Sequence, residues 1–487
     1  MSKNKVSKNY LYNMFYQILT FLTPFIVTPY LARHFGAESL GIYNYTYSIV
    51  YWFILLGMMG ISIYGNRQIA KVRDDKEKLS QTFSEIFTLQ VITVICSLAL
   101  FYIGCLYLGQ QYIDIFLLQG LMVFATMFDI AWFFNGVENF KKIAIRNSII
   151  KLLLLASILI IIKNPSQIVD YVLINVVMTF LGSIVMWIGL KKYIRPRVVK
   201  LRDAFKHLKK TVVLFLPQIA TTLYVIFTQT LIGVLYHDIR DVAFYNQAYK
   251  LIAMALTITT TIGVVMLPRM ANAKTKEGIE KIRNVTNKTF KIALFLSFPL
   301  AVGIGVCSVY FIPWFLTAEF VKVGYLLAIL APVIIIISLS NVTGTQFLLP
   351  NDRDKKYTIS VVIGCLVSIT FNLILIPYYG AFGAAITTVI TECFVLIVQF
   401  LWIRKEFNFN GIKAKIVKYS LVSLIMGIVV FGIGQIMGIR PITNVVQLFV
   451  GLIMYLGILY VTKDDILRYL INKLKELTSR KPTGGEV

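Results

Sequence analysis

Fourteen apolar stretches divide this chain, and each is long enough to cross a lipid bilayer as a helix. A transmembrane helix needs about 20 mostly apolar residues, and the whole chain is 57% hydrophobic. The predicted spans are residues 10–32, 40–65, 81–108, 113–137, 142–163, 168–190, 211–236, 241–268, 287–313, 322–349, 356–378, 382–403, 416–438 and 442–461. The sequence therefore predicts an all-α integral membrane protein with 14 transmembrane helices.

The basic residues between these stretches alternate in abundance. Of the 48 Lys and Arg residues, 41 fall in the two tails, in the even-numbered links or at the span ends beside them. The other links hold only five, namely Arg33, Lys163, Arg240, Lys322 and Arg440. Because cytoplasmic loops are enriched in Lys and Arg, both termini are predicted to be cytoplasmic. Lys151 and Lys250 fall inside apolar stretches and need another explanation.

The composition argues against several classes of protein. A net charge of +25 in a soluble chain would suggest a nucleic-acid partner. Here the cations lie in short links beside the membrane, so we expect contact with anionic lipid heads and no nucleic acid. All five cysteines fall inside apolar stretches without a CxxC pair, and the three histidines are scattered. Neither a disulfide framework nor a metal site is expected.

Two short matches indicate a repeat of six spans. LGIYNYTYSIV at 40–50 is similar to VAFYNQAYKLI at 242–252, and Lys141-Lys142 corresponds to Lys355-Lys356. Halves with an even number of spans share one orientation, and transporters built this way bind substrate between the halves. We predict an N-lobe over 1–190, a basic cytoplasmic linker over 191–210, a C-lobe over 211–404, an accessory helix pair over 405–462 and a cytoplasmic tail over 463–487. The linker would serve as a hinge, as a basic helix on the membrane surface, or as both.

Charged residues inside the predicted spans are costly, at about 2.5–3.5 kcal/mol each on insertion scales. Asp129 in span four and Lys151 in span five lie at similar depth, so we expect them to pair. Such a pair either holds the helices together or belongs to a polar path for a charged substrate. Glu392 lies in the middle of span twelve, where it is protonated or partnered. Arg33 ends span one, as an interfacial anchor or a substrate contact.

The first span of each predicted lobe carries a polar face. In span one the polar residues follow a spacing of three to four, which places them on one side of a helix. Proline in spans one and seven permits bending. We expect these spans to border a hydrated cleft, and the alternative is hydrogen bonding between packed helices. The candidate lining residues, including two asparagines from the following spans, are Asn13, Gln17, Thr20, Asn44, Gln218 and Asn246.

No catalytic motif is visible in the sequence. There is no Walker motif for ATP, no HExxH and no GxSxG. The outer links are too short to hold an enzyme site. We therefore expect a transporter that is not an enzyme and that carries no cofactor.

Four segments resemble a known family. They are PYLARHFGAESLGIYNY at 29–45, DIAWFFNGVENFKKIAIRN at 129–147, LLAILAPVIIIISLSNVTGTQFLLPNDRDKKYTIS at 326–360 and IPYYGAFGAAITTVITE at 376–392. In this order, on a fourteen-span scaffold, they are similar to the polysaccharide-transport branch of the multidrug/oligosaccharidyl-lipid/polysaccharide exporter superfamily. Its members are the Wzx-type flippases of O-antigen and capsule repeat units.

The resemblance implies two pseudo-symmetric six-helix lobes around a cavity that opens alternately to each side of the bacterial cytoplasmic membrane. The implied substrate is an oligosaccharide repeat unit on undecaprenyl diphosphate, flipped to the outer leaflet and passed to a polysaccharide polymerase. A proton or sodium gradient, or the membrane potential, would drive it. Arg33, Lys151 and Lys250 are the expected diphosphate contacts. Asp129 and Glu392 are expected to pair charges or to carry a coupling proton.

One departure and two alternatives follow from the residues. Related peptidoglycan-precursor flippases carry arginines deep in their first two spans, where this chain has no deep cation, which argues against lipid II as substrate. A drug or cation antiporter of the same superfamily would need acidic residues in its cavity, and only Asp129 and Glu392 lie at depth. A membrane-embedded polymerase or glycosyltransferase would need larger loops than these.

Overall fold

The computed structural model describes the backbone of residues 3–108, 110–276, 278–404 and 410–479; the side chains of several helical segments, among them 3–13, 216–221 and 261–283, lie outside the description. Every regular element in these ranges is a helix. Eleven helical stretches in the described part are long and apolar enough to cross a membrane. The first, Met14–Val72, has 59 residues and contains two predicted spans. A multi-pass all-α protein is thus confirmed, while the count of fourteen and the side of the termini stay predictions.

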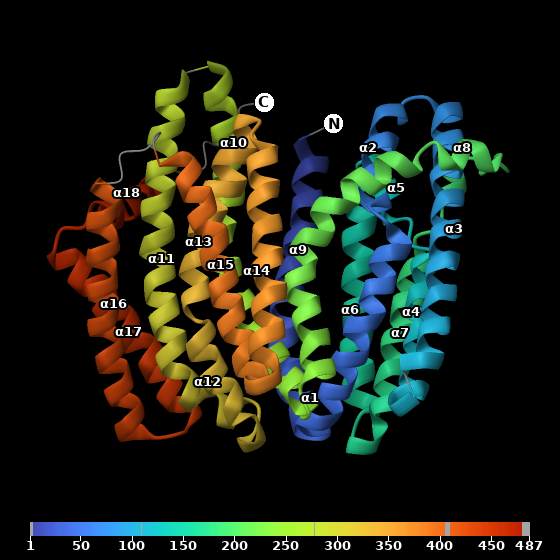
Figure 1. The fold of residues 1–487 in the computed structure, drawn as a ribbon. Helices are drawn as coiled ribbons and strands as arrows, with labels where there is room; N and C mark the ends of the chain where they lie inside the picture. The colour runs from blue at the N-terminus through green and yellow to red at the C-terminus, as the bar shows by residue number, and fades with distance from the viewer. Residues whose placement is uncertain (1–2, 109, 277, 405–409, 480–487) are drawn as a thin grey trace. The chain divides into compact units, whose positions relative to one another are not determined.

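The chain forms two compact units, of which the first contains Met1–Asn246 and Ile376–Gly380. Here α9 packs against α1 and α2. The predicted lobe boundaries stay a prediction, because these units are defined by packing alone. The first unit holds α1 (Lys3–Met58), α2 (Ile61–Val72), α3 (Lys76–Leu108), α4 (Ile113–Thr126), α5 (Ala131–Gly136), α6 (Phe140–Ile161), α7 (Ile168–Val185), α8 (Leu201–Phe205), α9 (Leu208–Leu235) and the start of α10 (Arg240–Lys276) (Figure 1).

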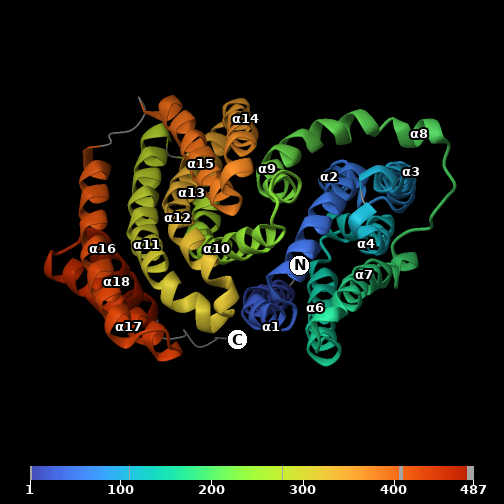
Figure 2. The same cartoon turned by 60° about the horizontal axis from the view of Figure 1, so that its bottom comes forward.

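The second unit contains Gln247–Leu375 and Ala381–Val487. Its long helix α11 packs against α12, α13, α16 and α17 (Figure 2). A π-helical turn at Gly344–Leu348 follows α13. Besides the rest of α10, the unit holds α11 (Gly278–Phe315), α12 (Val321–Leu330), α13 (Pro332–Thr343), α14 (Asp354–Tyr379), α15 (Ala381–Ile403), α16 (Asn410–Met437), α17 (Pro441–Val461) and α18 (Asp465–Ser479).

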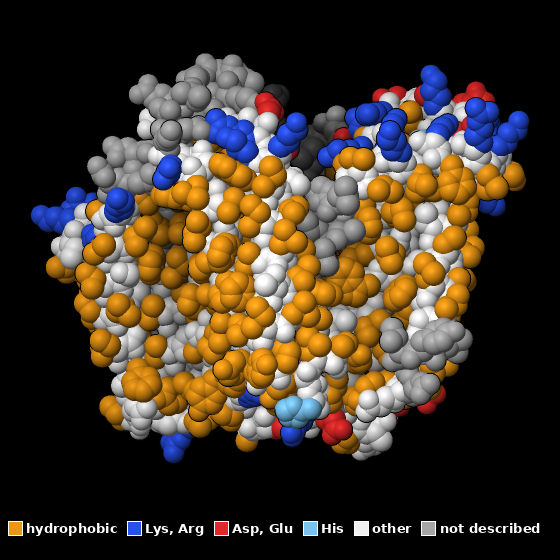
Figure 3. Space-filling model, in the orientation of Figure 1, with side chains coloured by type: hydrophobic (Ala, Val, Ile, Leu, Met, Phe, Trp, Pro, Cys, Tyr) orange, Lys and Arg blue, Asp and Glu red, His pale blue; other side chains and the backbone are white. Residues whose placement is uncertain are grey.

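The surface of the first unit is apolar along its helices and basic at one end. Figure 3 shows hydrophobic side chains over the length of the helices and a gathering of Lys and Arg where α2 and α8 lie. Large apolar side chains such as Leu100 and Ile160 are 58% and 72% exposed. Extensive exposure of this kind suits contact with lipid tails, which are as apolar as leucine.

The first predicted span and the second form one helix, α1, with a kink between them. The kink lies at Gly36, whose φ of 68° and ψ of −176° are not helical. A positive φ is strained for residues with a Cβ, which explains glycine at this position. The second span, predicted as 40–65, is interrupted in turn: Met59 and Gly60 have positive φ, and α2 begins at Ile61.

Predicted span four, 113–137, is also two helices, because α4 ends at Thr126 and α5 begins at Ala131. The break exposes backbone carbonyls, and the amide of Gln90 on α3 donates to three of them, those of Thr126, Met127 and Asp129, at 2.8, 3.2 and 3.0 Å. Trp187 Nε1 donates to a fourth, the Phe128 carbonyl, at 2.8 Å. A broken helix at membrane depth is tolerated only where such partners satisfy the backbone.

The basic linker over 191–210 is fastened to the start of α3. The backbone N–H groups of Arg195 and Arg197 donate to the hydroxyls of Ser80 and Ser84 at 3.1 and 3.0 Å. Of this linker, α8 spans only Leu201–Phe205 and a short 3₁₀ turn covers Leu190–Lys192. The linker is therefore not one continuous helix, and its part as a hinge or as a membrane-surface contact stays a prediction.

A buried charge cluster at the end of this linker strengthens the attachment. The carboxylate of Glu85, 3% exposed, accepts from Lys206 Nζ at 2.7 Å and lies 2.9 Å from Nε2 of His207. The other ring nitrogen of His207 lies 2.7 Å from the hydroxyl of Tyr64 on α2. Burial lowers the pKa of His207, while the neighbouring carboxylate raises it to a smaller extent. The cluster ties α2, α3 and the start of α9 together.

The C-terminal helix α18 is fixed to the second unit by a buried carboxylate. Asp464, just before α18, has a fully buried side chain that accepts from Lys415 and Lys418 at 2.6 and 3.0 Å and from the Tyr419 hydroxyl at 3.1 Å. It also accepts from the backbone N–H groups of Ile466 and Leu467, as an N-terminal helix cap does. Burial raises the pKa of Asp464, but the lysine hydrogen bonds outweigh it and hold the pKa at about 2.

We predict that Asp464→Asn destabilises the second unit much more than Asp465→Asn. Removing one partner of a buried ion pair costs about 3–5 kcal/mol, and Asp465 is over half exposed. Thermal unfolding of the purified protein in detergent should show a lower midpoint for Asp464→Asn only. Equal midpoints would contradict the buried cluster.

The same carboxylate predicts a pH dependence. Its pKa is about 2 in the fold against 3.8 in an unfolded chain. The stabilisation is therefore fully present above about pH 4 and lost as the pH falls through about 2. Hydrogen exchange of residues 465–473 should accelerate over this range, relative to α17, in the wild type. In Asp464→Asn the same residues should exchange fast at every pH.

Candidate functional site

The polar face of the first span divides into exposed and buried residues. Gln17 and Thr20 are exposed, whereas Thr23 and Thr28 are 6% and 3% exposed. The Thr23 hydroxyl donates to the Leu19 carbonyl of its own helix at 2.6 Å. The side chains of Asn13 and Gln218 lie outside the described residues, so their expected part in the cleft stays a prediction.

The charged pair expected between Asp129 and Lys151 involves a different cation. Asp129 lies in the break between α4 and α5, and its carboxylate is 3.7 Å from Nη2 of Arg146, a half-buried residue of α6. The same carboxylate accepts from the backbone N–H of Ala131, the first residue of α5, at 2.9 Å. The depth of a residue along α6 did not identify the cation that pairs with Asp129, because Arg146 lies only five residues before Lys151 on the same helix. Asp129 thus links the start of α5 to α6.

Lys151 is left as a deep cation without this partner. It lies near the middle of α6, is partly exposed, and forms neither an ion pair nor a hydrogen bond with the residues the structure describes. An uncompensated cation in the hydrocarbon region is expensive and marks a functional position by default. Among the predicted contacts, Lys151 therefore keeps the strongest physical reason for a role toward an anion.

The other predicted charged residues are distributed over both units. Arg33 is exposed on α1 just before the kink at Gly36, in the first unit. Lys250 is exposed on α10, and Glu392 is 4% exposed on α15, both in the second unit. These positions are compatible with the expected roles but do not test them.

The two predicted asparagines differ in their surroundings. Asn246 donates from Nδ2 to the Gln229 side chain at 3.1 Å, which links α10 to α9. Asn44 Nδ2 is buried and has no hydrogen-bond partner among the described residues. A buried amide without a partner costs about 1–3 kcal/mol, so Asn44 is the better candidate for meeting a polar substrate.

Sequence reasoning missed a run of tyrosines in ring contact beside Asn44. Tyr43 stacks on Tyr47 with ring centroids 5.9 Å apart, Tyr51 follows at 6.0 Å, and Tyr171 of α7 lies 4.7 Å from Tyr43. The signal was present, because tyrosines four residues apart share one face of a helix. The tyrosine cluster also needs Tyr171 of α7, and no local sequence pattern predicts that α7 lies beside α1.

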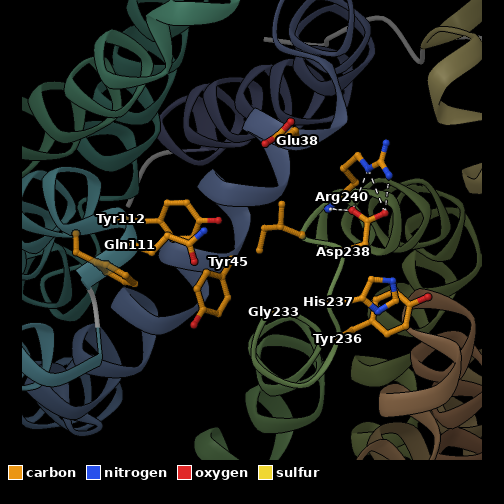
Figure 4. Close-up of a pocket in the computed structure, with 11 residues that line it drawn as sticks. Glu38, Tyr45, Gln111, Tyr112, Gly233, Tyr236, His237, Asp238 and Arg240 are labelled. Carbon is orange, nitrogen blue, oxygen red and sulfur yellow. Dashed lines mark hydrogen bonds and ion pairs between the residues drawn. The ribbon is translucent and has the colours of Figure 1, made fainter.

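A polar cavity of about 550 Å³ lies in the first unit, where the helices reach the side predicted to be outer. The kinked part of α1 contributes Glu38 and Tyr45, and the turn before α4 contributes Gln111 and Tyr112. Figure 4 shows these side chains on one side of the cavity and Asp238 and Arg240 on the other. The remaining lining residues are Phe116, Gly233, Tyr236, His237 and Ile239.

Two glycines allow the parts of this cavity to approach closely. A Cβ on Gly41 would lie 2.3 Å from the Ile239 carbonyl, and one on Gly233 would lie 2.0 Å from the Tyr45 ring. Either contact is shorter than real atoms permit, so only glycine lets α1 pack against α9 and the following turn. The turn is further shaped by Arg240, whose guanidinium donates to both carboxylate oxygens of Asp238 at 2.8–3.1 Å.

A second cavity, of about 480 Å³, lies in the second unit and is almost entirely apolar. It is bordered mainly by α11, α16 and α17, the last two being the predicted accessory pair. The small residues Gly303 and Gly451 open it, and Asn444, Gln447 and Tyr455 supply its few polar groups. A cavity of this character suits a hydrocarbon ligand.

These features define a class of protein. Many apolar helices, helix breaks within predicted spans and a cation in the middle of a predicted span without a described partner are typical of a membrane transporter. Residues 6–274, more than half of the chain, match the family model described as "Polysaccharide biosynthesis protein", and the chain belongs to this family.

Proteins that are similar to this chain over most of its length support the same family. A protein of Shigella dysenteriae named "Putative O-antigen transporter" is 26% identical over 387 residues, which are 78% of this chain and 95% of that protein. A protein of the same name from Escherichia coli (strain K12) is 22% identical over 429 residues, 83% and 99% of the two chains. The polysaccharide-transport branch inferred from the four motif segments is thus confirmed.

A solved structure of another protein has a similar fold. The lipid II flippase MurJ, in an inward closed conformation, superimposes with a TM-score of 0.74 over 93% of this chain and 100% of that one. At 16% sequence identity the likeness shows the fold alone. An all-helical fold like that of this flippase is thus shown, while the division into two six-helix lobes and a helix pair stays a prediction.

We predict that water reaches one face of the first half of α1. In a variant without native cysteines, cysteines at Gln17 and Thr20 should react with a charged maleimide, because both positions are exposed. Cysteines at the buried positions Thr23 and Thr28 serve as matched controls and should react at least about tenfold more slowly. Equal protection at all four positions would show a face packed against protein or lipid.

Proposed function

We propose that this protein moves oligosaccharide repeat units, linked to undecaprenyl diphosphate, from the inner to the outer leaflet of the bacterial cytoplasmic membrane. The observation that carries the proposal is the match to two O-antigen transporters over 95% and 99% of their lengths. The likeness to a lipid II flippase over the whole fold adds support. The expected orientation, with cytoplasmic termini, belongs to this proposal.

The chemistry of such a substrate fits the residues described. A diphosphate head cannot cross hydrocarbon unaided, because burying an isolated charge costs tens of kcal/mol in an apolar medium. Lys151 offers a cation at depth, with Arg33 and Lys250 as further contacts along the path. The apolar cavity beside α16 and α17 is suited to part of the isoprenoid chain. The polar face of α1 would meet the sugars.

Energy for the cycle must come from outside the chain's own chemistry, because the sequence has no ATP-binding motif. We propose that a proton or sodium gradient, or the membrane potential acting on the charged substrate, drives the cycle without a bound cofactor. Asp129 and Glu392, which is buried on α15, are the candidates to carry a coupling proton. The flipped product would pass to a polysaccharide polymerase in the outer half of the membrane.

The experiment that tests the proposal is depletion of the protein in its host, followed by labelling of lipid-linked repeat units with a probe confined to the outer leaflet. Loss of outer-leaflet labelling, together with accumulation of unlabelled lipid-linked units and loss of surface polymer, supports flipping. An unchanged leaflet distribution would contradict it.

Within this function, we predict that Lys151→Ala reduces surface polymer about tenfold, which corresponds to about 1.4 kcal/mol for one lost ionic contact. Lys151→Arg should restore most of the export, since it retains the charge. Lys200→Ala, which removes an exposed lysine of the linker, is the matched control and should export normally. Full export by Lys151→Ala at wild-type protein levels would show that Lys151 does not contact the substrate during transport.

A further inference from the structure

We propose that the polar cavity of the first unit is a saccharide-binding site, which holds the glycan of the substrate at the outer end of the transport path. The cavity is the one lined by Glu38, Tyr45, Gln111, Tyr112 and the turn at 236–240 (Figure 4). The assignment rests on the proposed function for the identity of the glycan. The assignment of the ligand as a saccharide rests on the geometry of the cavity alone.

The size and position of the cavity suit a sugar. A volume of about 550 Å³ falls within the range of about 300–1,000 Å³ that is usual for small-molecule sites. Its walls come from the kinked part of α1, from the turn before α4 and from the link between α9 and α10. All three belong to one compact unit, so the site does not depend on how the two units are arranged.

The aromatic residues of the cavity supply surfaces for sugar rings. Tyr45 and Tyr112 are in edge contact with ring centroids 6.4 Å apart, and Tyr236 lines another part of the wall. The face of an aromatic ring carries negative charge density, which attracts the polarised C–H groups of a pyranose. Each tyrosine also brings a hydroxyl that donates and accepts hydrogen bonds. Burial and the negative charge of Glu38 raise the pKa of Tyr112, which keeps its hydroxyl protonated.

The polar residues favour a neutral ligand rich in hydroxyls over the diphosphate. Arg240 is the only Lys or Arg among the lining residues, and its guanidinium is held by both oxygens of Asp238. Glu38 is exposed and adds a second carboxylate, so the lining carries net negative charge. A phosphate would be repelled, whereas sugar hydroxyls can donate to carboxylates and to the Gln111 amide oxygen.

The shape of the cavity is fixed by close packing of the elements that form its walls. The close approaches at Gly41 and Gly233 fix α1, α9 and the 236–240 turn against one another. Asp241, directly after the turn, is fully buried. Binding residues presented by such a packed framework lose little conformational freedom when a ligand arrives.

The test uses the full-length purified protein in detergent and a defined probe. The probe is the repeat-unit oligosaccharide released by mild acid from the host's own lipid-linked precursor, so that it carries neither lipid nor phosphate. Binding is measured by saturation-transfer NMR and by calorimetry. Glu38→Gln and Gln111→Ala change exposed side chains and leave the packing intact. We expect each to weaken binding, Glu38→Gln by about tenfold because it removes a charge-assisted hydrogen bond.

Two matched variants serve as controls. Asp114→Asn neutralises an exposed carboxylate in the first turn of α4, and Tyr378→Ala removes a tyrosine that is 78% exposed; neither residue lines the cavity. Both should bind the oligosaccharide as the wild type does. No binding by the wild type, or equal binding by cavity and control variants, would overturn the assignment.

Failure of this inference is distinguishable from failure of the proposed function. If depletion traps lipid-linked units in the inner leaflet but the oligosaccharide does not bind, flipping stands and the saccharide site is wrong. If the oligosaccharide binds in the cavity while depletion leaves the leaflet distribution unchanged, the saccharide site stands and flipping is wrong.

Discussion

The lipid interior offers no hydrogen bonds, and this constraint shapes the described part of the chain. Every backbone N–H and C=O at membrane depth must find a partner within the protein, which is why the regular elements described are helices. Departures from the helix occur where side chains satisfy the backbone. The clearest case is the break before Asp129, where Gln90 donates to three carbonyls and Trp187 to a fourth. That break in turn places the Asp129 carboxylate beside Arg146.

The sequence predicted the class of the protein and its family because both depend on local patterns. The length of an apolar stretch and the presence of a motif can be recognised without knowing how the helices pack. The interruptions at Gly60 and before Asp129 were not predicted, because hydropathy does not distinguish a continuous span from two packed halves. The partner of Asp129 was wrong for a related reason: depth along a helix is readable from sequence, but the direction of a side chain between neighbouring helices is not. The sequence also did not predict that the linker over 191–210 attaches to α3, where Ser80 and Ser84 accept backbone N–H groups of the linker.

The two cavities divide the chemistry that a lipid-linked glycan requires. The cavity of the second unit is apolar and adjoins α16 and α17, the pair outside the predicted repeat. The cavity of the first unit is polar, aromatic and net negative. Lys151 lines neither cavity and is a cation inside α6 without a described partner. In the proposed function, the isoprenoid chain, the saccharide and the diphosphate would each meet a different one of these chemical environments.

The central claim is translocation, and reconstitution tests it most directly. Purified protein would be placed in sealed vesicles with fluorescently tagged, lipid-linked repeat units in both leaflets, with an ion gradient or potential imposed. A membrane-impermeant quencher added outside removes the outer signal at once. The account predicts that vesicles with protein lose the protected inner signal as units reach the outer leaflet, while protein-free vesicles retain it. Equal protection with and without protein, under every gradient, would contradict the account.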